Sequence, residues 1–358
     1  MPIVAHNELP TFQRLREEGL TVMTPERAQH QDIRELHFGL LNMMPDAALA
    51  ATERQFFRLV GESNPIAQFY MHPFTLPSLK RGSTAQAHIG QYYDTFDDIR
   101  EQGLDGLIIT GANVTQPDLA SEPFWEPLME VYSWAQENVT SVLCSCLASH
   151  AVLQFRHGIK RRHLPSKRWG VFSHKVVDGS HPLVNDVNTQ FDVPHSRFNE
   201  VSREQVEAAG LHVLVESEAA GVHLLVSEDG LRTVYFQGHP EFDIISLLKE
   251  YKREVGNYVK GVLENYPPFP LNYFSVKAGA ILDEYRERVD AALQSRSAVP
   301  VFPEDILLPL LHNTWHDTGE AVVGNWIGLV YQVTSSDRQK PFMDKIDPQN
   351  PLGWLKNA

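Results

Sequence analysis

The sequence predicts an α/β protein in which a mostly parallel sheet is flanked by helices. The order of the segments indicates the class, and the composition indicates a globular protein. Short apolar runs alternate with segments of helical periodicity through the first two-thirds of the chain, and each run has the length of a buried strand. Hydrophobic residues make up 42% and charged residues 21% of the 358 residues, which is ordinary for a globular protein.

The first part of the chain supplies alternating strands and helices. The expected strands are Leu36–Leu41, Ile66–Met71, Gly106–Thr110 and Thr140–Cys144. The expected helices are Ala48–Val60, Glu122–Glu137 and Leu147–Phe155, whose apolar residues recur three or four positions apart. Strands that alternate with helices in this way pair in parallel, because the chain must cross over between them.

The pattern changes after Gly158, where short strand candidates follow one another closely. They are Val171–Val176, Phe191–Val193, His212–Val215, Val222–Ser227 and Thr233–Phe236. We expect these strands to extend the sheet and to add an antiparallel edge. A long helix, Asp243–Lys260, then begins with an aspartate that we interpret as its cap.

The last part of the chain predicts helices. An amphipathic helix is expected over Lys277–Gln294, a proline-rich connection over Val299–Pro309, and a last apolar element over Asn325–Val333. We interpret residues 1–358 as a single domain with an N-terminal segment (1–35), an α/β core (36–262) and a C-terminal helical extension (263–358).

Composition excludes several classes of function. The net charge of −14 argues against a general nucleic-acid binder, and no stretch approaches the ~20 apolar residues that cross a bilayer. Met1–Pro10 has neither a basic cluster nor an apolar run, so we expect a cytoplasmic protein with no membrane partner. The only cysteines, Cys144 and Cys146, are too close for an ordinary disulfide and too few for a zinc site.

Cys146 lies where a predicted strand turns into a helix. A thiol at this position meets the positive end of the helix, which favours the nucleophilic thiolate. The backbone N–H of Leu147 would point toward a developing oxyanion, as in nucleophile elbows. Alternatively, cysteine is often a buried packing residue, and Cys144, inside the apolar strand, keeps that interpretation.

His239 and Glu241 follow another predicted strand, Thr233–Phe236. A nucleophilic cysteine needs an imidazole within hydrogen-bond reach and a third group that holds the imidazole. Glu241 is two residues away, across a proline that stiffens the turn. The alternative for His239 is a surface histidine in a loop, since the chain has 16 histidines.

A glycine follows the predicted strand Gly106–Thr110. Gly111 lets backbone amides approach a ligand closely, so an amide of Ala112 or Asn113 is a candidate second oxyanion donor. A glycine in this position is also common in simple turns.

Taken together, the chain resembles the homoserine O-succinyltransferase family, the homoserine O-acyltransferases of methionine biosynthesis. About 300 residues look alignable, which is more specific than any single motif. The similar segments include Met1-Pro2-Ile3, Glu8-Leu9-Pro10, Leu15–Glu18, Asn42–Pro45, Asp105–Ala112, Cys146, Pro194–Arg197, Gly238–Asp243, Asn325-Trp326 and Tyr331–Val333.

The resemblance implies a fold like that of the class I glutamine amidotransferases and a ping-pong reaction. An acyl-CoA would acylate Cys146, and the hydroxyl of L-homoserine would then take the acyl group with His239 as base and Glu241 as its partner. It also implies a homodimer without bound cofactor or metal, with succinyl-CoA or acetyl-CoA as co-substrate. Lys167, Ser196 and Arg253 resemble the family's substrate-binding residues.

The chemistry of two of these residues suits the implied roles. The guanidinium of Arg253 can bind an amino-acid carboxylate bidentately, although it can equally be a solvated helix-face arginine. Lys167 belongs to a basic stretch, Lys160–Arg168, in an otherwise acidic chain. This stretch is a candidate site for a substrate carboxylate or coenzyme phosphates, or for most of its charges a solvated loop.

Three positions depart from the family pattern. Asp46 and Ala47 stand where the family commonly has two lysines, so no anion-stabilising role is assigned there. Thr115 stands where acetyl enzymes tend to have glutamate and succinyl enzymes glycine. Its lack of charge would not repel a succinyl carboxylate, which favours succinyl-CoA. The segment Lys277–Gln294 exceeds the usual family length and has no assigned function.

Other reactions use the same residue types. Homoserine O-acetylation and serine O-acylation stay open, and Ser196 matches the homoserine pattern. A glutaminase of the same fold usually flanks its cysteine with glycines, whereas Cys146 is flanked by Ser145, Leu147 and Ala148. A binding protein of this fold would be expected to lack part of the Cys–His–Glu set.

Overall fold

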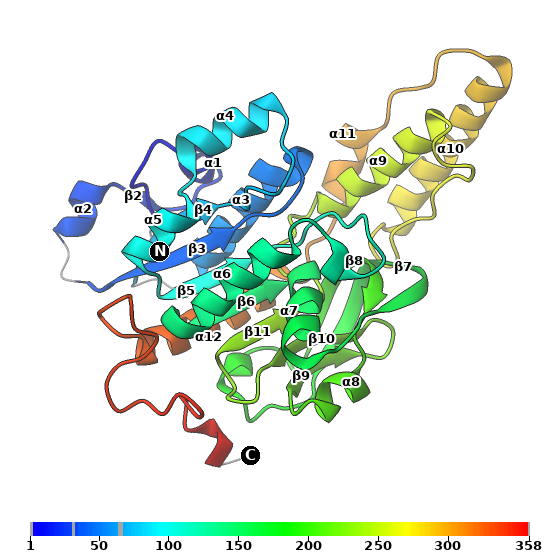
Figure 1. Cartoon of the computed structure of the whole chain (residues 1–358). Helices are drawn as coiled ribbons and strands as arrows, with labels where there is room; N and C mark the ends of the chain where they lie inside the picture. Colours follow the sequence, from blue (N-terminus) through cyan, green and yellow to red (C-terminus); the bar gives the residue numbers. More distant parts are fainter. Residues whose placement is uncertain (1–2, 31–32, 64–66, 357–358) are drawn as a thin grey trace.

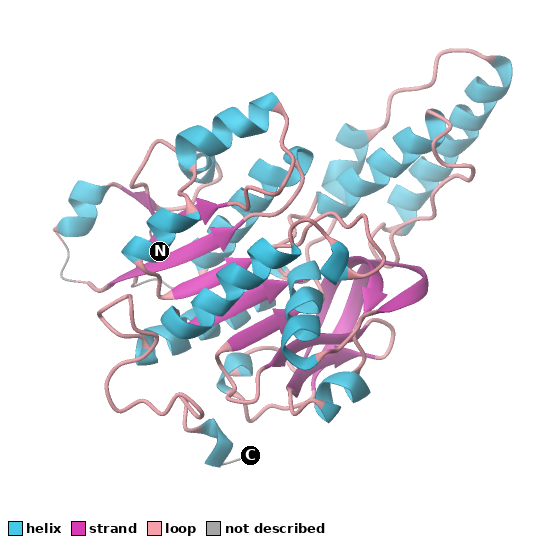
Figure 2. Ribbon diagram, viewed as in Figure 1, coloured by secondary structure: helices cyan, strands magenta, loops and turns pink. Residues whose placement is uncertain are grey.

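An eleven-stranded sheet forms the centre of the molecule, with the strand order β2-β1-β4-β3-β5-β6-β11-β10-β9-β7-β8. The computed structural model describes residues 3–30, 33–63 and 67–356. Helices cover both faces of the sheet (Figures 1 and 2). The predicted α/β class is therefore confirmed.

One half of the sheet is parallel. Its strands are β1 (Ile3–Val4), β2 (Val22–Met23), β3 (Glu35–Leu41), β4 (Gln68–Phe74), β5 (Gly106–Ile109), β6 (Ser141–Ser145) and β11 (Thr233–Phe236). All their mutual pairings are parallel. The four strands predicted in this region are present, although Ile66, the predicted start of one, lies outside the described residues.

The other half is antiparallel, as predicted. Its strands are β7 (Arg162–Val176), β8 (Gln190–Glu200), β9 (His212–Ser217) and β10 (Gly221–Val226). The antiparallel series starts where β10 pairs with β11 and ends with the long β7–β8 pair. β7 and β8 are much longer than the predicted Val171–Val176 and Phe191–Val193, because both continue into a polar, partly exposed stretch without apolar alternation.

The helices differ in which face of the sheet they cover. The described helices are α1 (Pro10–Glu17), α2 (Pro25–Gln29), α3 (Asp46–Glu62), α4 (Ser83–Tyr92), α5 (Phe96–Gln102), α6 (Trp125–Asn138), α7 (Leu147–His157), α8 (Arg203–Ala208), α9 (Ser246–Val259), α10 (Val276–Ser295), α11 (Glu304–Leu307) and α12 (His316–Val333). Buried side chains of α1, α3 and α12 share one core, and those of α5, α6 and α7 share a second.

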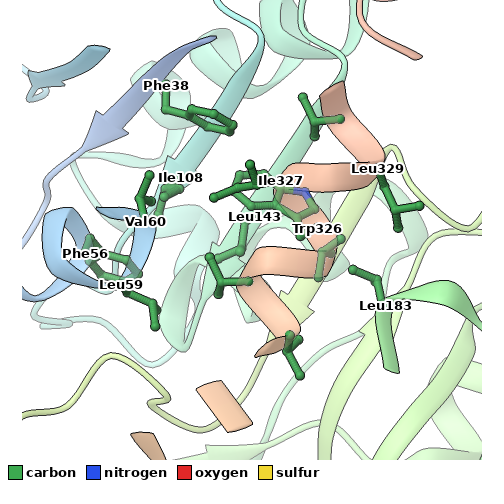
Figure 3. Close-up of a cluster of buried hydrophobic side chains, with 14 of the residues drawn as sticks. Phe38, Phe56, Leu59, Val60, Ile108, Leu143, Leu183, Trp326, Ile327 and Leu329 are labelled. Atoms are coloured by element: carbon green, nitrogen blue, oxygen red, sulfur yellow. The ribbon is translucent and has the colours of Figure 1, made fainter. Parts of the chain in front are cut away.

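Alternate residues of each central strand belong to these two cores, because successive strand side chains point to opposite faces. Ile108 and Leu143 face α3 and α12, whereas Ile109 and Cys144 face α6 and α7. Figure 3 shows the first core, where Trp326 of α12 lies beside Leu143. The strands are apolar on both faces, as a buried parallel sheet requires.

The region after β11 departs from prediction in two ways. The helix α9 begins at Ser246 with Ile245 as its cap, so Asp243 does not cap it and instead pairs with Arg54 and Arg58. The predicted connection Val299–Pro309 contains the short helix α11. α9, α10 and α11 form a third apolar core and project from the sheet as a helical arm (Figure 1).

Among the described residues, none of the helices is both long enough and apolar enough to span a membrane.

Candidate active site

Three neighbouring parallel strands end together and bring the predicted residues to one edge of the sheet. Cys144 of β6 pairs with Ile109 of β5 on one side and with Tyr235 of β11 on the other. The chain leaves β5 at Gly111, β6 at Cys146 and β11 at His239 shortly beyond these pairs. Carboxyl ends of parallel strands are where α/β proteins commonly bind ligands.

Cys146 occupies the tight turn between β6 and α7 and is partly buried. Its backbone has φ 53° and ψ −106°, outside the regions that residues other than glycine normally adopt. The Cys146 N–H donates to the Phe236 carbonyl over 2.7 Å. The Ser149 hydroxyl bonds the carbonyls of Cys144 and Phe236 at 2.8 and 2.9 Å, which ties the first turn of α7 to both strands.

His239 lies between Glu241 and Cys146. Its Nδ1 is 2.7 Å from Oε1 of Glu241, and Cys146 is near enough to the ring to raise the pKa of His239. Because Nδ1 faces Glu241, Nε2 is the nitrogen left for the sulfur. The ring is stacked on Phe242 at 4.2 Å between centroids, and the His239 N–H donates to the Pro194 carbonyl.

The electrostatics of this trio favour a charged imidazole. Burial alone would lower the pKa of His239, but the charges of Glu241 and Cys146 and hydrogen bonds to both raise that pKa well above its usual value. Two further cations act on the sulfur, since the charge of Cys146 also raises the pKa values of Arg161 and Arg197 against the effect of burial. Burial dominates for Arg197 and lowers its pKa to about 10, so the guanidinium stays charged at neutral pH.

The proposed oxyanion donors flank Cys146. Leu147 is the first residue of α7, and the first N–H groups of a helix have no partner within that helix. Gly111 lies against the cysteine, because a Cβ added at Gly111 would be 4.0 Å from Cβ of Cys146 and 3.6 Å from Sδ of Met44. Ala112 follows in the same turn.

Two of the three predicted substrate residues meet at one carboxylate. Nζ of Lys167 lies 3.2 Å from Oε2 of Glu250, and the Ser196 hydroxyl donates to the same oxygen over 2.8 Å. Arg253 is one turn further along α9, but its side chain is 62% exposed and pairs with Glu254. The structure therefore joins Lys167 to Ser196 but does not bring Arg253 into contact with them.

The two unusual family positions have defined partners. Thr115 donates its backbone N–H and its hydroxyl to Glu122, which also accepts the N–H of Gln116. Asp46 pairs with Arg81 at 3.3 Å and accepts the N–H of Gly82 at 2.7 Å. Arg81, whose side chain is 6% exposed, thus accompanies the acidic Asp46.

Several residues of this region were not predicted as site residues. Glu250, Glu122, Arg81 and Arg197 belong to segments far from Cys146 in the sequence. Arg197 lies in the Pro194–Arg197 segment that carried the resemblance, which is the one signal that pointed to it. The others are single charged residues in helices and loops, where most such residues are solvated.

Comparison with known proteins decides the family. The family model described as homoserine O-succinyltransferase matches residues 2–336. The chain belongs to the homoserine O-succinyltransferase family. A homoserine O-succinyltransferase of Allochromatium vinosum is 67% identical over 353 residues, and one of Methylococcus capsulatus is 63% identical, each match covering 99% of both chains. The segment Lys277–Gln294 is therefore not an addition relative to these two family members.

Among solved structures, a glutamine amidotransferase of Thermotoga maritima aligns with a TM-score of 0.44 and 11% identity. The alignment covers 84% of this chain and 99% of that chain.

Proposed function

We propose that the protein transfers a succinyl group from succinyl-CoA to the hydroxyl of L-homoserine, giving O-succinyl-L-homoserine. The observation that carries the proposal is the Cys146–His239–Glu241 arrangement at the strand ends of a homoserine O-succinyltransferase family member. The relatives named above bear the same activity in their names. We include in the proposal a cytoplasmic location and a single acyltransferase domain over residues 1–358.

In the first half-reaction the Cys146 thiolate attacks the thioester carbonyl of succinyl-CoA. The N–H groups of Leu147 and Ala112 stabilise the oxyanion, and the tetrahedral intermediate collapses with loss of the CoA thiolate, which takes a proton from His239. Cys146 then carries the succinyl group as a thioester.

In the second half-reaction the homoserine hydroxyl gives its proton to His239 and attacks the acyl carbonyl. The Cys146 thiolate leaves, and the enzyme returns to its starting state. Glu241 holds the imidazole in position and stabilises its charged form in both steps. All groups in these steps belong to the chain or its substrates, so the scheme uses no bound cofactor or metal.

The Lys167–Ser196–Glu250 cluster is the proposed site for the amino-acid end of homoserine. A carboxylate held between a lysine and a hydroxyl matches the α-ammonium group, and the lysine matches the α-carboxylate. Arg253 would reach the α-carboxylate of homoserine only by breaking its ion pair with Glu254. The side chain of Arg253 is exposed enough to make this change of partner.

The test combines each of two donors, succinyl-CoA and acetyl-CoA, with each of two acceptors, L-homoserine and L-serine. Succinyl-CoA with homoserine should release CoA fastest, and mass spectrometry should identify O-succinylhomoserine as product. A preference for acetyl-CoA would overturn the donor assignment, and a preference for serine would overturn the acceptor. Ammonia release from glutamine would point instead to a glutaminase.

The proposal also includes a homodimer. The helical arm supports it, because Val276 and Val301 are 94% and 92% exposed and Ile306 is 58% exposed. Apolar side chains grouped on one projection commonly mark an interface. Light scattering should give twice the chain mass, and Val301→Glu should lower it; a monomeric wild type would contradict this part.

A further inference from the structure

The loop after β5 and the start of β7 are joined beside the active site. Nζ of Lys160 lies 3.0 Å from one carboxylate oxygen of Asp118, and the Gln154 amide donates to the other oxygen over 2.7 Å. These contacts hold α7, which contains Gln154, and the segment just before β7, which contains Lys160, against the loop that carries Thr115.

Arg161 lies at this junction and is partly buried. Within the described parts of the chain, its guanidinium makes no hydrogen bond and no ion pair, although two carboxylates are near enough to affect it electrostatically. Those carboxylates are engaged elsewhere: Glu122 with the backbone of Thr115, and Asp118 with Lys160. A partly desolvated guanidinium with free donors suits a carboxylate ligand, which can accept two parallel hydrogen bonds.

Arg161 is also within electrostatic reach of the nucleophile. Burial lowers the pKa of Arg161, while the charge of Cys146 is the largest influence that raises it. The loop that carries Thr115 begins at Gly111, which lies against Cys146. Asp118 of the same loop binds Lys160, the residue before Arg161. Arg161 therefore lies beside the loop that adjoins the nucleophile.

The other cation that faces Cys146 is less suited to bind a ligand. The guanidinium of Arg197 donates to Nδ1 of His195 over 3.2 Å and to the carbonyls of Asn199 and Ala220. These bonds occupy all three of its nitrogens, whereas those of Arg161 have no hydrogen-bond partner among the residues that the structure describes.

We propose that Arg161 binds the distal carboxylate of the succinyl group while Cys146 carries the acyl chain, and so selects succinyl-CoA over acetyl-CoA. The inference rests on the proposed function. It gives the donor preference an attractive element, whereas the carboxylate that lies at Thr115, that of Glu122, is bound by the N–H groups of Thr115 and Gln116. An acetyl group has no carboxylate and would gain nothing from Arg161.

The test measures the rate of CoA release in the acylation step for both donors. Arg161→Gln should lower kcat/KM for succinyl-CoA by about 10- to 100-fold, the range expected for a lost charge-assisted hydrogen bond. The value for acetyl-CoA should stay within about twofold, since no charged contact is lost. Arg161→Lys should recover part of the loss, because lysine keeps the charge without the bidentate geometry.

Arg162→Gln is the matched control. This neighbouring arginine is 60% exposed and pairs with Glu200, so both donors should react as with the wild type. Equal losses for both donors in Arg161→Gln would mean that Arg161 binds the shared coenzyme or supports the fold, which overturns the inference, as would no loss for either. A wild type that refuses succinyl-CoA overturns the proposed donor first, and the inference with it.

Discussion

At the scale of single residues, Cys146 has a strained backbone that hydrogen bonds of the surrounding turn hold in place. Its positive φ is unfavourable for a residue with a Cβ, and such strain persists only where surrounding contacts hold it. The Cys146 N–H bond to Phe236 and the Ser149 bonds to both strands provide those contacts. The strain points the thiol out of the strand end, toward His239.

Glu241→Gln tests the assigned role of the glutamate. The amide keeps the shape but not the charge, so the raised pKa of His239 should fall and the imidazolium should lose its partner. Turnover should fall by roughly 10²- to 10⁴-fold, as when the orienting carboxylate of a triad is neutralised. Steady-state kinetics with succinyl-CoA and L-homoserine would measure the turnover.

The control for this variant is Glu130→Gln. Glu130 is exposed and pairs with Arg100 at 3.5 Å, so turnover should stay unchanged. If folded Glu241→Gln protein kept activity close to the control, Glu241 would not hold the catalytic imidazole.

At the scale of elements, the turn between β11 and α9 is fastened to helices on one face of the sheet. Arg54 and Arg58 of α3 both bind the carboxylate of Asp243, Arg54 at 2.7 Å. Nε1 of Trp315 donates to the Phe242 carbonyl over 2.8 Å. Because Phe242 is stacked on His239, these contacts reach the imidazole through the turn.

Asp243→Asn should loosen this turn. The substitution removes the more buried of the two carboxylates that Arg54 and Arg58 share, since Asp243 is 11% exposed and Glu18 is 37% exposed, and should lower the free energy of unfolding by roughly 1–3 kcal/mol. Turnover should fall more than substrate affinity, because the displaced group is the imidazole. Urea denaturation and kinetics would measure the two effects.

Asp337→Asn serves as the comparison, since Asp337 is 52% exposed and its pair with Lys340 spans 3.7 Å. An Asp243→Asn protein as stable and active as this control would show that the α3 contacts do not position the turn.

The sequence predicted elements well where packing leaves a pattern. The central strands were readable because both faces are buried, which produces unbroken apolar runs. The helix α4 was missed because only Ala85 on it is buried, so it has no apolar stripe. The start of α12 was missed because its first turn, with His316 and Asp317, is polar.

At the scale of the whole molecule, the same reasoning explains which site residues were predicted. Cys146, His239 and Glu241 each follow a readable strand, and parallel strands end at a common edge. Glu250 meets Lys167 and Ser196, and Glu122 meets Thr115, only through the packing of α9 and of the loop after β5. No local pattern of sequence encodes those contacts.

The buried histidines should make the folded protein sensitive to acid. Burial lowers the pKa values of eight histidines: His6, His37, His150, His157, His174, His181, His195 and His223. Below about pH 6.5 the unfolded chain takes up protons at these residues and the folded chain does not, so stability falls with pH. Each such group costs up to about 1.4 kcal/mol per pH unit.

Four groups, His239, His316, Glu320 and Asp105, have raised pKa values and offset part of this loss. The free energy of unfolding should still fall by roughly 3 kcal/mol or more between pH 7 and pH 5. Urea titrations at several pH values would measure it. Constant stability across this window would mean that the histidines are not held neutral in the fold.

The most direct test of the account is the mass of the intact protein after incubation with succinyl-CoA alone. The wild type and Cys144→Ala, which changes the fully buried cysteine, should each gain one succinyl group, and L-homoserine should then remove it. Cys146→Ala should gain none. A succinyl adduct that persists in Cys146→Ala, or product formation with no adduct on the wild type under any condition, would contradict an acyl group carried on Cys146.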